Sequence, residues 1–322
     1  MSVVVPCYNV EAYIQRFIDS LVKQTFRYFE AIFVEDGSTD DGLAILKKNA
    51  EKYDFIQVIS QKNQGVGMAR NKGLFAARGN YILFLDPDDF IEPKLLEENY
   101  KLAEETNAEM VIFGFHTLDE RGQHLSTTRS NKQRMLKTHQ EVVADLPNLI
   151  KETNIFVPWN KVYRKAFLDQ HQLIFSNQRT GQDSLFNIDV FKKVSSITIS
   201  PEVYYHYIFA RTNSATSKMD QIRLVDDMRI CSMFKQFAFS ENLPTKFAYS
   251  LHLSKLYKNM CKLEYTNKQY LVYLFSLDEI QEFLTVAKMS YFDDWKDKYR
   301  FIKCRMMSVR LRKQVYLLRT KS

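Results

Sequence analysis

Cysteine is scarce in this 322-residue sequence. The four cysteines stand far apart, at Cys7, Cys231, Cys261 and Cys304. No two of them have the Cys-x-x-Cys spacing, and no histidines cluster at the spacing of zinc ligands. This pattern argues against a disulfide framework and a zinc site, and it is typical of reduced thiols in the cytosol. We therefore expect a cytoplasmic protein.

Long hydrophobic runs are also missing. No apolar stretch approaches the roughly 20 residues that a bilayer-spanning helix needs. The opening residues, Met1 followed directly by SVVVP, lack the pattern of a signal peptide, so we expect none. Hydrophobic residues make up 45% of the chain and charged residues 26%, which is typical of a soluble globular protein. The length suits one large domain or a core domain plus a smaller one.

Net positive charge is lacking over most of the chain, although the net charge of the whole is +7. Residues 295–322 contain ten Lys or Arg and one Asp, a net charge of +9, so residues 1–294 together carry −2. The basic character is local. A surface-wide footprint for nucleic acid is therefore not supported, and we expect no nucleic-acid partner.

Short apolar runs alternate with helical periodicity through the first 115 residues, which predicts an α/β fold with a mostly parallel, doubly wound sheet flanked by helices. Strands are expected at 2–6, where Pro6 would end the strand, and at 29–35, 55–60, 81–85 and 110–115. Further on, we expect a hairpin or loop at 117–131, a short strand at 197–199, an aromatic strand at 204–207 and helices from about 221. The predicted domains are 1–219, with halves 1–116 and 117–219, and a smaller helical region at 220–322.

A cluster of acids follows the most apolar of these runs. The strand predicted at 81–85 leads directly into Asp86-Pro87-Asp88-Asp89. Mutual repulsion makes such a cluster costly, so a divalent cation is its natural partner. Ligands of open α/β sheets bind at the carboxyl ends of strands, where these acids lie. The alternative is a turn whose aspartates cap the helix that follows.

Several spaced motifs together resemble family 2 glycosyltransferases, which are inverting enzymes of GT-A fold and include bacterial capsular and surface-polysaccharide enzymes. VVVPCYNV, FVEDGSTDDG and NQGVGMARNKGLFAARGNYILFLDPDD resemble the donor-binding half of the family. WNKVYRKAFL and GQDSLF resemble the acceptor-side half. The resemblance covers roughly residues 2–217. It implies a glycosyltransferase that takes a sugar from a nucleotide donor, with UDP as the expected nucleotide.

The resemblance also implies roles for individual residues on the donor side. Pro6 and Tyr8 would flank the nucleobase, and Asp36 would accept a hydrogen bond from the uracil ring. Asn63 and Arg70 would line the nucleotide pocket. Asp86-Pro87-Asp88 corresponds to the DxD motif, in which Asp88 would hold Mn²⁺ or Mg²⁺ and Asp86 would lie near the ribose, the sugar and the metal. Arg211 and Ser214 resemble a loop that closes over the diphosphate.

On the acceptor side, Asp183 stands where the family has its catalytic base. An in-line displacement at the anomeric carbon needs one base to deprotonate the acceptor hydroxyl. The alternative for Asp183 is an N-cap, because Ser184 begins a helical pattern. Many relatives have Glu-Asp here, whereas this chain has Gln182-Asp183, so one negative charge beside the base is missing. Trp159 is either a platform for the acceptor sugar or part of the core.

The sequence thus predicts a metal-dependent, inverting hexosyltransferase that uses a UDP-sugar. The leading acceptor is a lipid-linked glycan of capsule or surface polysaccharide, and a glycoprotein is the alternative. Two other classes compete: a nucleotidyltransferase, and a non-catalytic partner subunit of a glycosyltransferase pair. The sugar and linkage stay open, and a homo-oligomer is possible.

The basic C-terminal segment suggests a further partner. Apolar and basic residues interleave from Trp295 onward, a composition found in helices that lie on anionic membranes. We expect this segment to bring the enzyme to the inner face of the membrane without crossing it. The alternative is a helix whose apolar side packs in the core while its charges stay solvated.

Overall fold

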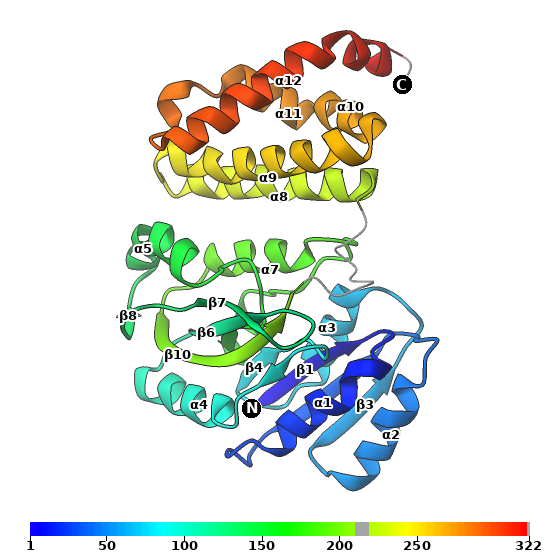
Figure 1. Cartoon of the computed structure of the whole chain (residues 1–322). Helices are drawn as coiled ribbons and strands as arrows, with labels where there is room; N and C mark the ends of the chain where they lie inside the picture. Colours follow the sequence, from blue (N-terminus) through cyan, green and yellow to red (C-terminus); the bar gives the residue numbers. More distant parts are fainter. Residues whose placement is uncertain (210–218, 321–322) are drawn as a thin grey trace. The chain divides into compact units, whose positions relative to one another are not determined.

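The computed structural model describes residues 1–209 and 219–320 and divides into two compact units (Figure 1). The first unit comprises residues 1–178 and 182–214, and the second comprises 179–181 and 215–322. The sequence-based division into 1–219 and 220–322 stays a prediction. Each unit has a separate hydrophobic core.

The first unit is built on one mixed sheet with the strand order β3-β2-β1-β4-β9-β6-β10-β5, to which β7 adds beside β6 and β8 beside β10. The strands are β1 (Ser2–Cys7), β2 (Glu30–Glu35), β3 (Ile56–Ser60), β4 (Tyr81–Phe84), β5 (Phe90–Ile91), β6 (Met110–Leu118), β7 (His124–Thr128), β8 (Arg134–Leu136), β9 (Lys161–Arg164) and β10 (Ile197–Ile208). β1 to β4 pair in parallel. β9 is antiparallel to both neighbours, β4 and β6, so β6 and its parallel partner β10 run in the direction of β4. The predicted mostly parallel α/β sheet is confirmed.

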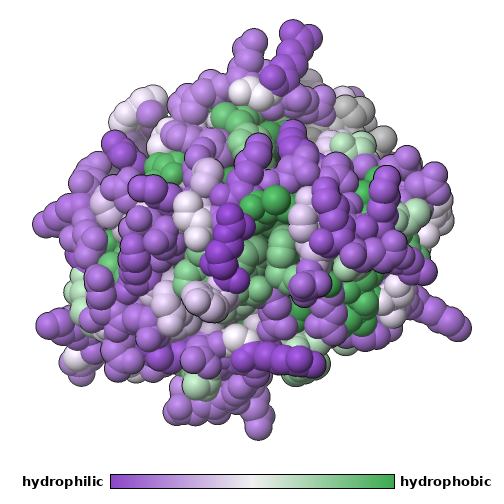
Figure 2. Space-filling model, turned by 90° about the horizontal axis from the view of Figure 1, so that it is seen from below, coloured by the Kyte–Doolittle hydropathy of each residue, from purple (hydrophilic) through white to green (hydrophobic). Residues whose placement is uncertain are grey.

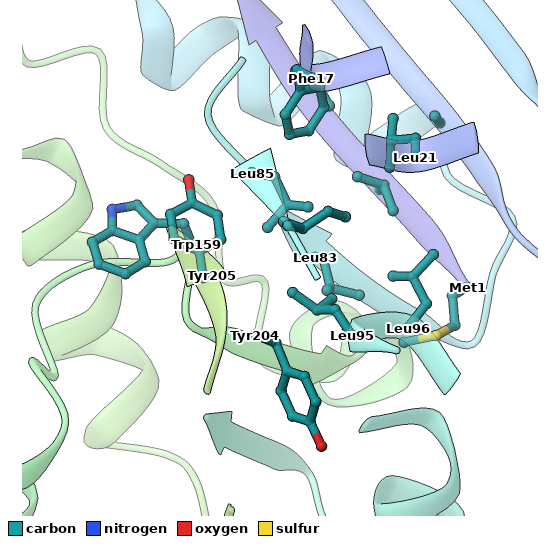
Figure 3. Close-up of a cluster of buried hydrophobic side chains, with 14 of the residues drawn as sticks. Met1, Phe17, Leu21, Leu83, Leu85, Leu95, Leu96, Trp159, Tyr204 and Tyr205 are labelled. Carbon is teal, nitrogen blue, oxygen red and sulfur yellow. The ribbon is translucent and has the colours of Figure 1, made fainter. Parts of the chain in front are cut away.

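Helices cover both faces of this sheet, because its central strands are apolar on both sides. They are α1 (Glu11–Val22), α2 (Gly42–Lys52), α3 (Val66–Ala76), α4 (Leu95–Thr106), α5 (His139–Glu152), α6 (Lys165–Gln170) and α7 (Gln182–Phe191). Leu83 and Leu85 pack with Phe17 of α1 and with Leu95 and Leu96 of α4 in one buried cluster (Figure 3). The residue between them, Phe84, faces the opposite side.

On that opposite side Phe84 meets Phe186 of α7 edge to face, with ring centroids 5.7 Å apart. α3 lies close against the same face of the sheet because Gly73 has no side chain. A Cβ at this position would collide with the side chain of Val4 in β1. The absence of a side chain here therefore sets how closely α3, and the residues it carries, can approach the strand ends.

Two local predictions are wrong. Pro6 does not end the first strand: β1 continues to Cys7, and Pro6 pairs with Val34 of β2. A proline is tolerated here because β4 pairs with β1 only as far as Val4. On the β4 side, the missing N–H of Pro6 therefore costs no hydrogen bond of the sheet.

The strands expected at 197–199 and 204–207 are one strand, β10, with register shifts around Val203. The expected hairpin exists and is formed by β6 and β7.

The second unit is helical, as predicted. It contains α8 (Gln221–Ser240), α9 (Thr245–Thr266), α10 (Lys268–Ser276), α11 (Asp278–Val286), a short 3₁₀ turn (Met289–Tyr291) and α12 (Trp295–Arg319). Apolar side chains from all five α-helices form its core, among them Leu253 and Phe283. Within residues 1–209 and 219–320, we find no helix whose length and hydrophobicity would let it cross a membrane. Figure 2 shows one face of the molecule, on which hydrophilic side chains predominate and hydrophobic surface appears in smaller areas between them.

Candidate active site

The ends of the parallel strands bring the predicted donor-side residues to one edge of the sheet, since β1, β2, β3 and β4 all point the same way. Pro6 is buried in β1, whereas Tyr8 just beyond it is 49% exposed. Asn9 has a left-handed backbone (φ 51°), and its side-chain oxygen accepts a hydrogen bond from the Thr39 N–H at 2.9 Å. The turns after β1 and β2 are therefore joined to each other.

Asp36 organises the loop that follows β3. Its carboxylate is buried and accepts three hydrogen bonds, from the Gln61 side chain at 2.7 Å, the Gln64 N–H at 2.9 Å and the Gly65 N–H at 2.8 Å. Asn63, in the middle of this loop, is exposed. Asp36 thus fixes the loop that presents Asn63, and a contact of Asp36 with a nucleobase remains a prediction.

The acids after β4 form a tight group. Oxygens of Asp86, Asp88 and Asp89 lie within 4.8 Å of one another, close enough to share a metal ion. Asp89 differs from the other two, because it is buried and accepts hydrogen bonds from the Tyr205 hydroxyl at 2.6 Å and the Ile208 N–H at 2.8 Å. Asp86 and Asp88 are partly exposed. The two residues of the predicted DxD motif are therefore the accessible ones, and Asp89 anchors their loop to β10.

Arg70 joins the acid cluster to the predicted base. It lies on α3 and is 2% exposed; one guanidinium nitrogen donates to Asp86 at 2.8 Å and another donates to Asp183. The guanidinium also lies over the ring of Phe175, 5.3 Å from its centroid. The sequence predicted a place for Arg70 beside the nucleotide. The structure places it between two carboxylates of the site, a role that no sequence pattern indicated.

Asp183 lies in the first turn of α7, which begins at Gln182 rather than at Ser184 as expected. Its side chain points to Arg70 and is 26% exposed, so the carboxylate is held in place and still reachable. Burial raises the pKa of Asp183, Arg70 opposes the rise, and the charge of Asp86 adds to it. Burial alone would lower the pKa of Arg70, but the two aspartates outweigh it and that pKa is raised. A carboxylate with a raised pKa is a stronger proton acceptor.

Burial also raises the pKa of Asp89 well above its ordinary value, with a further rise from Asp86, although the bonds from Ile208 and Tyr205 oppose it. The Tyr205 hydroxyl that donates to Asp89 also accepts the N–H of Asp86, at 3.4 Å. From the other side, Arg16 of α1 donates to the backbone carbonyl of Asp88 at 2.6 Å. The acid loop is thus braced by α1 and β10. No sequence pattern distinguishes Arg16, and Tyr205 is one of several tyrosines in an aromatic strand.

The predicted acceptor-side residues are both largely buried. Trp159 is 4% exposed, and its indole stacks on Tyr205 with centroids 4.6 Å apart and on Tyr207 at 5.4 Å (Figure 3 shows Trp159 and Tyr205). This supports the core alternative for Trp159. Gln182 is 6% exposed, and its side-chain oxygen has no hydrogen-bond partner within the described part of the chain. Arg211 and Ser214 lie outside the described residues.

Buried Lys161 is a structural residue that sequence reasoning missed. Its ammonium donates to the carbonyls of Asn154 and Val157 at 3.2 and 2.6 Å and to the Asn160 side chain at 2.8 Å. Burial lowers its pKa well below the ordinary value, and Asp183 partly counteracts this. Lys161 therefore fixes the loop that carries Trp159. Its place in the WNKVYR motif was the available signal.

Residues 2–171, more than half of the chain, match the family described as "Glycosyl transferase family 2". The chain belongs to glycosyl transferase family 2. The matched range includes the whole of β1 to β4, the acid cluster and Arg70. Asp183 lies beyond it.

Individual relatives are similar over about two thirds of this chain. "Uncharacterized glycosyltransferase EpsJ" of Bacillus subtilis (strain 168) is 32% identical over 208 residues, which are 64% of this chain and 60% of that protein. "Poly(ribitol-phosphate) beta-glucosyltransferase" of Bacillus spizizenii is 29% identical over 217 residues, 66% of this chain and 32% of that protein. The similarity therefore spans less than two thirds of the length of either relative.

Among solved structures, residues 1–349 of TarS from S. aureus in complex with UDP-GlcNAc match with a TM-score of 0.73 at 20% identity. The match covers 98% of this chain and 89% of that structure, so it includes the helical region as well as the sheet. The fold predicted from the motifs, a GT-A sheet followed by a smaller helical region, is confirmed.

Proposed function

We propose that this protein is an inverting glycosyltransferase that moves a sugar from a UDP-sugar to a hydroxyl acceptor. The observation that carries the proposal is the Arg70 bridge, which holds the acid cluster after β4 and the carboxylate of Asp183 in one fixed arrangement. An acid cluster suited to a diphosphate donor and a separate carboxylate suited to the acceptor are the two parts that such a transfer needs. Family membership supports the donor class, as does the similarity to structures of TarS in complex with UDP-GlcNAc and with UDP.

In the proposed reaction Asp183 is the general base. Its carboxylate takes the proton from the acceptor hydroxyl as that oxygen attacks the anomeric carbon and the bond to the nucleotide diphosphate breaks. Inversion requires the hydroxyl to approach from the face opposite the leaving group. Arg70 holds the carboxylate of Asp183 in position through their ion pair. Because the side chain of Asp183 is partly exposed, an acceptor hydroxyl can reach it.

The acid cluster fits a hard divalent cation, Mn²⁺ or Mg²⁺, because its donors are carboxylate oxygens. Asp88 and Asp86 would hold the ion, whereas both oxygens of Asp89 already accept hydrogen bonds from β10. Such an ion supplies positive charge that offsets the charge developing on the leaving diphosphate. At the neighbouring strand ends, the nucleoside would be bound by Tyr8, Asp36 and Asn63. Pro6 would flank the nucleobase.

For the acceptor, we favour a lipid-linked glycan or polyol phosphate chain of surface-polysaccharide synthesis, at the inner face of the membrane. Relatives named for poly(ribitol-phosphate) glycosyltransfer support this class. A glycoprotein acceptor is the alternative. A nucleotidyltransferase is disfavoured, because β1 ends in Pro6-Cys7 and is followed by Tyr8-Asn9 rather than by a glycine-rich phosphate loop with a basic residue.

The test is a screen of the purified chain with UDP-sugars, measuring UDP release with and without Mn²⁺ and a polyol phosphate acceptor. We expect acceptor-dependent UDP release that Asp183→Asn lowers by about 10²–10⁴-fold, while UDP binding persists. Asp189→Asn, a matched change on a more exposed carboxylate of the same helix, should leave transfer unchanged. Equal activity of Asp183→Asn and the wild type would place the base elsewhere. Absence of UDP release with every donor would support a non-catalytic partner subunit.

A further inference from the structure

The C-terminal helix α12 has two apolar faces rather than one. Its first face packs into the core of the second unit through five buried side chains: Phe301, Cys304, Met307, Leu311 and Val315. This is the core-facing alternative considered for the helix, and it accounts for one side of α12. It leaves the other apolar side chains of the helix without a place in the core.

Most of those remaining side chains form the second face, which we call the apolar stripe. It consists of Trp295, Tyr299, Ile302, Met306 and Val309 and, beyond the exposed Lys313 on the same side, Tyr316 and Leu317. Leu318 is exposed but lies outside the stripe. They recur at intervals of three and four residues up to Val309, so they lie along one side of the helix, opposite the buried face. They are well exposed: Trp295 is 70% exposed, Met306 63% and Val309 75%. A solvent-facing helix surface of this length normally carries polar residues.

Two rows of cations flank the apolar stripe. Lys296, Lys303 and Arg310 follow one another at seven-residue intervals along one side, and Lys298, Arg305 and Arg312 do the same along the other. All but Lys298, which is half-buried, are exposed. Arg310 also reaches Glu264 of α9 at 3.3 Å, an exposed pair that is easily exchanged for another partner.

These rows decide which partner fits the apolar stripe. If the stripe paired with the same stripe of a second copy, the cation rows would take the positions beside the seam of a two-helix pair. Lysine and arginine would then face lysine and arginine in either orientation, and like charges at these positions oppose pairing. An anionic surface, in contrast, is attracted by both rows at once.

We propose that α12 docks on an anionic lipid bilayer through its apolar stripe, with the two cation rows at the headgroups. Trp295, Tyr299 and Tyr316 are side chains that favour the interface between lipid and water. Met306 and Val309 enter the acyl boundary between them. The assignment deepens the proposed function, in which the acceptor is lipid-linked, but it does not depend on any catalytic residue.

The experiment uses the full chain and vesicles of phosphatidylcholine with or without phosphatidylglycerol. We expect sedimentation with the anionic vesicles only, weakening as salt is raised. Fluorescence gives a second readout: of the two tryptophans, Trp159 is buried, so a blue shift on vesicle binding reports Trp295. The double variant Met306→Glu/Val309→Glu should lower binding at least tenfold, because it replaces inserted apolar groups with charges.

The matched control is Tyr265→Glu/Val286→Glu, which adds the same charge at exposed apolar positions of α9 and α11. It should bind vesicles as the wild type does. Circular dichroism and UDP release in solution should be unchanged in both variants, which separates a failure of docking from a failure of the proposed activity. Equal vesicle binding by both double variants, or binding to neutral vesicles alone, would overturn the proposal. So would a wild-type dimer that Met306→Glu/Val309→Glu dissociates.

Discussion

Arg70 is the residue on which the candidate site depends most, because it fixes two carboxylates from elements far apart in the sequence. Asp86 follows β4 and Asp183 lies in the first turn of α7, yet one buried guanidinium binds both. The planar group has donors on separate nitrogens, so it can serve two acids in a set geometry, which a lysine cannot do. A displacement of either carboxylate should therefore displace the other through Arg70.

The acid cluster gives a prediction about metal binding. Asp88→Ala removes one accessible carboxylate and should lower the affinity for Mn²⁺ and abolish UDP release, since a hard cation held at this site needs its oxygen ligands. Isothermal titration with Mn²⁺, followed by the UDP-release assay, measures both effects. Asp169→Ala, an exposed carboxylate on α6, is the control and should change neither. Full turnover by the wild type in excess chelator would contradict the metal requirement.

Gln182 offers a prediction about pH. The base works when deprotonated, so transfer is lost as pH falls through the pKa of Asp183, which already lies above its ordinary value. Gln182→Glu places a second carboxylate beside it, disfavours the ionised form and raises that pKa further. The acidic limb of the kcat/KM profile should therefore move to higher pH. Gln170→Glu, the same change at an exposed position on α6, should leave the limb in place. A shift toward lower pH would show that Asp183 is not the group observed.

At the scale of elements, the sequence predicted what depends on local pattern. The apolar runs and the acids after them located β1 to β4 and their shared edge, because buried parallel strands have a recognisable composition. β9 was missed, since its four residues include the polar Lys161, whose burial depends on carbonyls of the preceding loop. The sequence also did not predict that Asp89 anchors the loop while Asp86 and Asp88 stay accessible. This difference depends on the hydrogen bond from Tyr205, which lies 116 residues away from Asp89 in the chain.

The packing of α3 gives a prediction at this scale. Gly73→Ala adds a methyl group where the side chain of Val4 already lies, so α3 must move away from β1 or β1 must shift. Overpacking of this kind costs about 1–3 kcal/mol. Because α3 carries Arg70, transfer activity should fall as well. Lys72→Ala, at an exposed position of the same helix, is the control for both chemical denaturation and activity. Unchanged stability of Gly73→Ala would mean that α3 adjusts freely and does not set the position of Arg70.

The whole molecule combines two units whose cores have no residue in common. The core of the first unit lies on both faces of the sheet, against α1, α2 and α4 on one face and α3 and α7 on the other, and that of the second is formed by α8 to α12. Of the described residues, all those proposed for donor, metal and base belong to the first unit, and the apolar stripe belongs to the second. The chemistry and the proposed docking to lipid therefore depend on different parts of the chain.

Differential scanning calorimetry can test this separation. Two independent cores should unfold in two transitions rather than one, since the two-state description holds for single domains. UDP with Mn²⁺ binds the first unit in our proposal, so it should raise the midpoint of one transition and leave the other in place; at a hundredfold excess over the dissociation constant, the stabilisation is about 2.7 kcal/mol. Leu253→Ala, a cavity in the core of the second unit, should lower only the transition that UDP leaves unmoved. A single transition that shifts as a whole with both UDP and Leu253→Ala would show that the two cores unfold together, and that binding at the strand ends stabilises the C-terminal helices as well.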